Sequence, residues 1–169
     1  EPVRVVYLGD SITAGAGASE DALAYTELLR EDRSSTWSDS ADLDLESLYG
    51  ELEVIDVSQG GATTGSLLAS QLPALDDALG DSVPGETLVV MTVGGNDVRS
   101  ALNPLADTQS IVDKVVRNIE TAVLDLQGRF PDGAYIYLTN VYEPTDGVGQ
   151  WGGCFWAMDF SDRLPVLYD

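Results

Sequence analysis

The stretch that decides the fold is residues 5–15, which read VVYLGDSITAG. It starts as an apolar run typical of a buried strand and then enters a glycine-rich turn that carries Ser11. A strand that ends in this way presents a nucleophile. A serine hydroxyl needs a neighbouring base, usually an imidazole, before it can attack, yet the chain contains no histidine. Either the chemistry is not serine catalysis, or the base lies on polypeptide outside these 169 residues.

The rest of the chain alternates predicted strands with predicted helices. Apolar runs predict strands from Val3 to Leu8, Glu53 to Val57, Thr87 to Val93 and Ala134 to Thr139. Helical spacing predicts helices from Ala22 to Arg30, from Thr64 to Leu79 with a break at Pro73, and from Ser110 to Gln127, closed by Gly128. Continuous apolar strands favour a parallel sheet that is covered on both faces. We therefore expect one α/β domain spanning residues 1–169.

Unusual turns follow the first three strands. They are Gly9-Asp10-Ser11, Ser58-Gln59-Gly60-Gly61-Ala62-Thr63-Thr64 and Gly94-Gly95-Asn96-Asp97. In open α/β sheets, ligands bind outside the carboxyl ends of the strands. The three turns are therefore expected to converge on one site at one edge of the sheet.

Each turn offers a group that acyl transfer to water requires. Ser11 has a hydroxyl and, at the expected start of a helix, a backbone N–H. The N–H of Gly61 can approach a substrate oxygen closely because glycine has no side chain, and Asn96 can donate from its amide. Singly, these residues are explained as a helix cap or as turn formers. Their order at successive strand ends favours the catalytic interpretation, with Ser11, Gly61 and Asn96 as the catalytic residues.

These blocks resemble those of the SGNH hydrolases, the GDSL-type esterases and lipases. Residues 9–15 are similar to the first block, with Ser11 at the nucleophile position. Gly61 matches the glycine of the second block, with Gly60 as the weaker alternative, and residues 94–97 match the third block, with Asn96 as its asparagine. The blocks span residues 9 to 97 in the family's order.

The resemblance implies a three-layer α/β/α, flavodoxin-like fold that hydrolyses esters through an acyl-serine intermediate, with no metal and no organic cofactor. The family also carries a fourth block, Asp-x-x-His, which this chain lacks. The expectation is that a C-terminal helix and strand are absent from the chain by truncation or nicking. A companion fragment would then supply the histidine. Cys154 is then either a free buried thiol or the residue that links the two pieces by a disulfide.

Composition restricts the partners. Eight basic against 29 acidic residues give a formal net charge of −21, which argues against nucleic acid and is compatible with a saline habitat. No apolar stretch reaches the roughly 20 residues that span a bilayer. The opening residues carry no initiator methionine and no signal sequence, which suits either a mature protein after export or a trimmed chain. Of the two we expect export, with secretion to the extracellular space. The acidic loop within residues 32–50 lacks EF-hand spacing and is expected to be solvated rather than calcium-bound.

The substrate and one rival function stay open. A group of large apolar residues follows the fourth predicted strand: Tyr142, Trp151, Phe155, Trp156 and Met158. They either line a pocket for a lipid or acetylated-carbohydrate ester, or form core beneath a loop. The rival is a non-catalytic carbohydrate- or ligand-binding module that kept the pocket, which the lack of histidine would explain. A phosphate or nucleotide binder is disfavoured, because neither the G-x-G-x-x-G nor the P-loop motif is complete.

Overall fold

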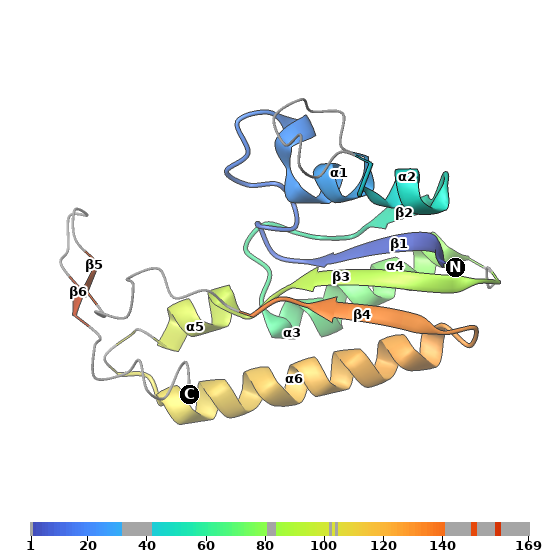
Figure 1. The fold of residues 1–169 in the computed structure, drawn as a ribbon. Coiled ribbons are helices and arrows are strands. Elements are labelled where there is room, and N and C mark those ends of the chain that lie inside the picture. The colour runs from blue at the N-terminus through green and yellow to red at the C-terminus, as the bar shows by residue number, and fades with distance from the viewer. Residues whose placement is uncertain are drawn as a thin grey trace.

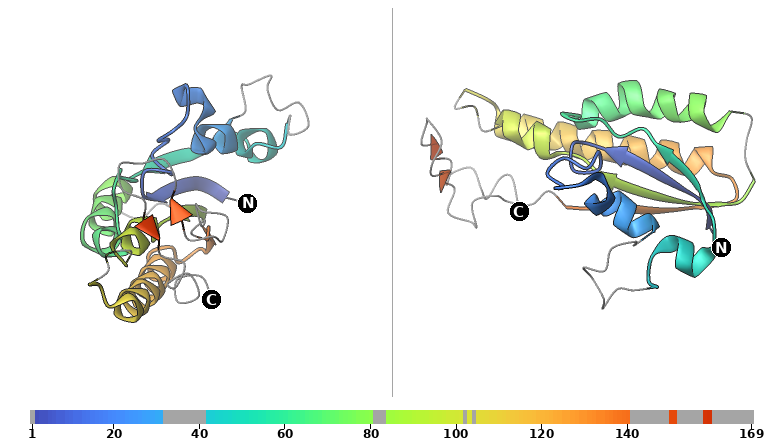
Figure 2. Two further views of the ribbon diagram at one scale, coloured as in Figure 1. Left: turned by 90° about the vertical axis from the view of Figure 1, so that its left-hand side faces the viewer. Right: turned by 90° about the horizontal axis from the view of Figure 1, so that it is seen from above.

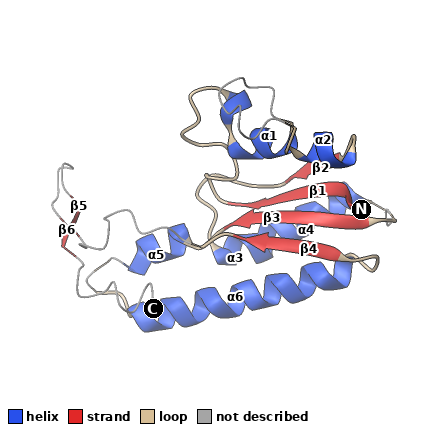
Figure 3. Ribbon diagram, viewed as in Figure 1, coloured by secondary structure: helices blue, strands red, loops and turns tan. Residues whose placement is uncertain are grey.

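A four-stranded parallel sheet forms the centre of the protein (Figures 1 and 3). In the computed structural model, the described residues are 2–31, 42–80, 84–101, 103, 105–140, 150–151 and 158–159. The strands are β1 (Pro2–Gly9), β2 (Glu53–Asp56), β3 (Glu86–Thr92) and β4 (Ala134–Leu138), in the order β2-β1-β3-β4. Each agrees with a predicted strand to within one residue at either end. A separate antiparallel pair, β5 (Gln150–Trp151) and β6 (Met158–Asp159), lies in the C-terminal part.

Helices lie on both faces of the sheet, as Figures 1 and 2 show. One face carries the 3-10 turn η1 (Asp21–Leu23), α1 (Tyr25–Arg30) and α2 (Leu45–Tyr49). On the other side lie α3 (Thr64–Ser66), the π-helical turn η3 (Leu67–Gln71), α4 (Leu72–Leu79) and the long α6 (Thr108–Arg129). The short α5 (Gly95–Ala101) follows β3 at the carboxyl edge. The predicted three-layer α/β/α fold class is confirmed.

The strand β1 shows why the sheet is buried on both faces. Val6 and Leu8 pack into the core shared with η3, α4 and α6, whereas Val5 and Tyr7 pack toward α1 and α2. All four side chains are at most 1% exposed. Successive side chains of a strand point to opposite faces, so a continuous apolar run is what a central parallel strand requires.

Three helix predictions need correction. Residues 22–30 do not form one helix, because Ala24 has an extended backbone between η1 and α1. The residues after Ser11 do not start a helix: residues 11–17 form successive turns, because Gly15 and Gly17 adopt positive φ values of 80° and 95° that a right-handed helix cannot include. Gly128 does not close the long helix, which continues through Arg129 and ends before Pro131.

The break expected at Pro73 is present as a change of helix type. The predicted helix over residues 64–79 consists of α3, η3 and α4, and Pro73 lies in the first turn of α4. Proline has no N–H to donate to the preceding turn, so the widened turn η3 precedes it.

Several predictions fall outside the described residues. They concern Cys154, Tyr142, Phe155, Trp156 and most of the acidic loop, and the side chains of Trp151 and Met158 are likewise not described. Within the described part of the chain, no helix is both long and apolar enough to cross a membrane.

Candidate active site

The three turns predicted to converge are bonded to one another at the carboxyl edge of the sheet. Two hydrogen bonds join turns directly, from the Gln59 N–H to the Gly9 carbonyl at 3.0 Å and from Asn96 Nδ2 to the Ala62 carbonyl at 2.8 Å. A third bond joins the first turn to the end of β3, from the Asp10 N–H to the Thr92 carbonyl at 2.8 Å. The first and third turns are therefore tied through β1 and β3, and the second is tied to both. The sheet brings Ser11, Gly61 and Asn96 to the same edge, as their positions in the sequence predict.

Ser11 lies in the first turn beyond β1 and is half-buried. Among the described residues, neither its hydroxyl nor its backbone N–H has a hydrogen-bond partner. The turn is held by its neighbour Asp10, whose carboxylate accepts the Ile12 N–H at 3.0 Å and the Thr92 hydroxyl at 3.1 Å. Asp10 thus serves as a turn residue, and Ser11 keeps both of its polar groups available.

A network of hydroxyl groups, most of it buried, supports the turn that carries Ser11. The hydroxyls of Thr13 and Thr92 lie 2.6 Å apart, and the Tyr25 phenol donates to the Thr13 hydroxyl at 3.0 Å. Burial raises the pKa of Tyr25, and its hydrogen bond to Thr13 acts in the opposite direction. The phenol is therefore neutral and a donor at ordinary pH. Sequence analysis missed this network, although threonines inside apolar runs were the available signal.

Gly61 supplies an accessible backbone N–H. Its φ of 80° lies in the left-handed region that favours glycine, and no heavy atom lies within 4 Å of the place a Cβ would take. Among the described residues its N–H has no acceptor. Gly60 has no positive φ, so the backbone conformation distinguishes the two glycines.

The orientation of the Asn96 amide is fixed by its bond to Ala62. A carbonyl oxygen only accepts, so the nitrogen of the amide must face it. One N–H is used in that bond and a second N–H remains on the same nitrogen. Asn96 is the second residue of α5 and is half-buried, which leaves the amide within reach of a small molecule.

A second support, which sequence analysis also missed, comes from Gln71. Its side-chain Oε1 accepts the Gly9 N–H at 2.8 Å, and its Nε2 donates to the Gly9 carbonyl at 2.8 Å. Gln71 is 2% exposed. Its amide therefore pairs with the last residue of β1 as a neighbouring strand would, at the point where β2 has already ended.

No cluster suited to a metal ion occurs in the part of the chain that the structure describes: three or more His, Cys, Asp or Glu side chains are nowhere grouped. The polar groups that Ser11, Gly61 and Asn96 offer are a hydroxyl, backbone N–H groups and an amide.

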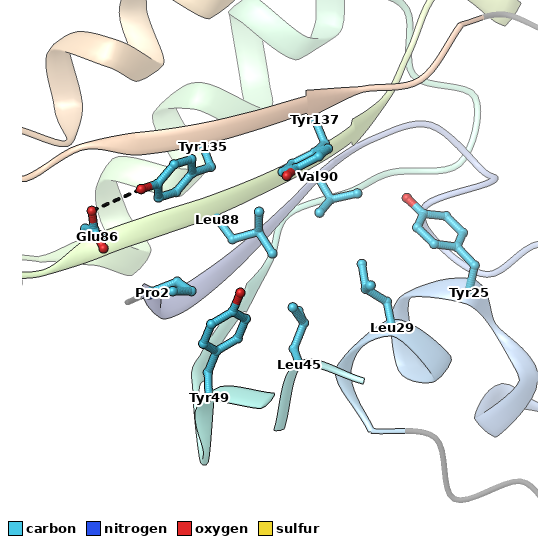
Figure 4. A pocket seen from close by; sticks show the side chains of 10 residues that line it. All are labelled: Pro2, Tyr25, Leu29, Leu45, Tyr49, Glu86, Leu88, Val90, Tyr135 and Tyr137. Atoms are coloured by element: carbon cyan, nitrogen blue, oxygen red, sulfur yellow. Dashed lines mark hydrogen bonds between the residues drawn. The ribbon is translucent and has the colours of Figure 1, made fainter. Parts of the chain in front are cut away.

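A pocket of about 760 Å³ opens elsewhere, on the sheet face that carries α1 and α2 (Figure 4). Tyr135 and Tyr137 project into it from β4 and are 53% and 63% exposed. The Tyr135 phenol donates to Glu86 at 3.3 Å. Ser11, Gly61 and Asn96 do not line this pocket, so it is separate from the turns at the carboxyl edge.

Comparison with models of known protein families assigns the chain to one of them. The model of the GDSL-like Lipase/Acylhydrolase family matches residues 7–157, which include all three turns. The chain belongs to the GDSL-like lipase/acylhydrolase family. None of the curated proteins compared matches the chain. Membership in this family supports a general esterase or acylhydrolase function and a small-molecule ester as substrate. The four-stranded parallel sheet agrees with an α/β GDSL fold.

Proposed function

We propose that this GDSL-like protein is a serine esterase in which the Ser11 hydroxyl attacks the ester carbonyl. The observation that carries the proposal is the set of polar groups at one sheet edge: the Ser11 hydroxyl and N–H and the Gly61 N–H have no partner among the described residues, and Asn96 retains a second amide N–H. Backbone and amide donors of this kind stabilise the negative charge that develops on the carbonyl oxygen, each contributing roughly 10²- to 10³-fold in rate.

The reaction needs a base that these 169 residues do not contain, since the sequence has no histidine. In the proposal, an imidazole takes the Ser11 proton as Oγ bonds to the carbonyl carbon, and then gives the proton to the departing alcohol. Water hydrolyses the resulting acyl-serine by the same steps. Without the base, the oxyanion donors and binding alone are expected to retain roughly 10³- to 10⁴-fold acceleration over water.

We place the histidine on a companion polypeptide, with Cys154 as the residue available for a disulfide to it. We also propose that the protein is exported. The companion is tested by the intact mass of the protein purified from its source, measured under denaturing conditions with and without reductant. A second, histidine-containing species supports the proposal, and its dependence on reductant decides the role of Cys154. A single species of 18.0 kDa contradicts it.

The catalytic step is tested by hydrolysis of a short-chain aryl ester with imidazole added as an external base. Ser11→Ala removes the nucleophile, and Ser70→Ala is the matched control because Ser70 is an exposed serine whose hydroxyl only donates to the Ser66 carbonyl. After the rate with imidazole but no protein is subtracted, we expect imidazole-dependent turnover in the wild type and the control but not in Ser11→Ala. Equal rates in all three proteins would refute the assignment of Ser11. Comparing acetate release from acetylated carbohydrate with fatty-acid release from lipid esters then defines the substrate.

The second candidate is a ligand-binding module without catalysis, and the observation that favours it is the lack of histidine. A fluorophosphonate separates the two functions, because it forms a covalent bond only with an activated hydroxyl. Binding of a sugar or an ester without any fluorophosphonate adduct would favour the module.

A further inference from the structure

The buried carboxylate of Asp97 has no role in the proposed reaction and lies next to Asn96. Asp97 is the third residue of α5 and is 8% exposed. One carboxylate oxygen accepts the backbone N–H of Thr64 at 2.8 Å, and the other accepts the Thr64 hydroxyl at 2.9 Å. Thr64 is the first residue of α3 and is completely buried. A single side chain therefore joins the beginnings of two helices.

The carboxylate of Asp97 fixes the direction of these hydrogen bonds, and a third residue, Asn118, completes the network. Asn118 of α6 donates from Nδ2 to the Thr64 hydroxyl oxygen at 3.0 Å. A carboxylate only accepts and a hydroxyl has one proton, so the Thr64 proton must point to Asp97 and its oxygen must accept from Asn118. The chain of donors runs in one direction, from Asn118 through Thr64 to Asp97.

This chain of donors fixes the spacing of the proposed oxyanion donors. The loop with Gly61 and the loop with Asn96 are tied at two neighbouring points: Asn96 to Ala62, and Asp97 to Thr64. Two ties, at adjacent residues of one loop and two residues apart in the other, restrict rotation as well as separation of the loops. The Gly61 N–H and the Asn96 amide are thereby held relative to each other, which oxyanion stabilisation requires because misplaced donors lose their effect on the transition state.

We propose that Asp97 is a positioning residue for the oxyanion donors, acting through Thr64, with Asn118 completing the network. The inference rests on the proposed esterase function. Asp97 does not contact the substrate. It holds the Thr64 loop so that Gly61 and Asn96 face the same carbonyl oxygen.

Asp97→Asn is the primary test because it preserves shape and replaces one acceptor by a donor. The new NH₂ group faces either the Thr64 N–H, which then has no acceptor, or the Thr64 hydroxyl oxygen, whose proton can then go only to the Oδ1 of an Asn118 amide that has turned over. The native network is lost in either case. We expect kcat to fall by about 100-fold, the effect of losing one oxyanion donor, while KM changes little. Asp113→Asn, at an exposed carboxylate of α6, is the matched control.

The double variant Asp97→Asn with Asn118→Asp reverses the whole network. The amide introduced at position 97 would accept the Thr64 N–H and donate to the Thr64 hydroxyl, whose proton would then go to the carboxylate at position 118. Every donor again has an acceptor. We expect the double variant to recover most of the lost kcat, whereas Asn118→Asp alone places two carboxylates against one hydroxyl proton and lowers kcat.

Each rate is the rate of ester hydrolysis with imidazole as base, minus the rate of the same protein carrying Ser11→Ala. Urea unfolding is measured in parallel. Loss of kcat in Asp97→Asn with recovery in the double variant supports the inference. Wild-type kcat in Asp97→Asn overturns it, as does a loss that the double variant fails to restore. Should Asp97→Asn not fold, Thr64→Ser is expected to keep kcat and Thr64→Val to lose it, and equal rates in these two overturn the inference. A wild-type protein without any Ser11-dependent rate refutes the proposed function itself, which distinguishes the two failures.

Discussion

Replacing Gln71 by methionine tests whether a side chain completes the pairing of β1. Methionine is close to glutamine in shape but has neither an acceptor nor a donor in place of the amide. In the variant, the Gly9 N–H loses its acceptor at 2.8 Å, whereas the Gly9 carbonyl still accepts the Gln59 N–H at 3.0 Å. One buried donor is therefore left unsatisfied, which costs about 1–3 kcal/mol.

A change of about 2 kcal/mol in the free energy of unfolding corresponds to a roughly 30-fold change in the ratio of folded to unfolded protein. Equilibrium urea unfolding measures it, and we expect a lower midpoint with an unchanged slope because the surface exposed on unfolding is the same. Gln127→Met, at an exposed glutamine near the end of α6, controls for the change of residue type. A Gln71→Met variant as stable as this control would refute the reasoning.

Other consequences follow from single residues. Gly9→Ala is expected to lower the free energy of unfolding by at least about 3 kcal/mol, because its Cβ would overlap the Thr92 carbonyl at a φ of 125°; urea unfolding would show this, and a stable variant would contradict the geometry. Burial raises the pKa of the Tyr7 phenol above its ordinary value of 10.0, so its stabilising contribution is full below that pH and falls as the pH rises beyond it. Tyr7→Phe should flatten this alkaline dependence of the unfolding free energy. It should also lower the unfolding free energy by about 1 kcal/mol at neutral pH, because the bond to the Thr26 carbonyl is lost. A Tyr7→Phe variant with the same alkaline dependence as the wild type would rule out this contribution of Tyr7. Gly61→Ala should cost about 1–2 kcal/mol because of its positive φ and should lower the Ser11-dependent rate of ester hydrolysis, and a variant equal to the wild type in both assays would exclude this role for Gly61.

The sheet and its turns were predictable because their signals are local. A strand covered on both faces requires an apolar run such as residues 5–8, and parallel strands place the turns that follow them on one edge. These two facts predicted that the turns carrying Ser11, Gly61 and Asn96 lie at one edge of the sheet.

The supports of the site were not predictable because they depend on contacts between distant parts of the chain. Gln71 reaches Gly9 from 62 residues away, and Asn118 reaches Thr64 from 54 residues away. Nothing in the residues around a glutamine or an asparagine tells whether its amide will be buried against backbone or solvated. The helix expected at Ser11 was wrong for a related reason, since helical spacing does not show which glycines adopt positive φ.

The most direct test of the central claim is the site at which a fluorophosphonate reacts in the presence of imidazole. The protein is incubated with the reagent, digested, and analysed by mass spectrometry for the modified peptide, with Ser11→Ala and Ser70→Ala treated in parallel. The account predicts one adduct, on Ser11, in the wild type and in Ser70→Ala and none in Ser11→Ala. An adduct on another residue, or an unmodified wild-type protein, would contradict the claim that Ser11 is the nucleophile.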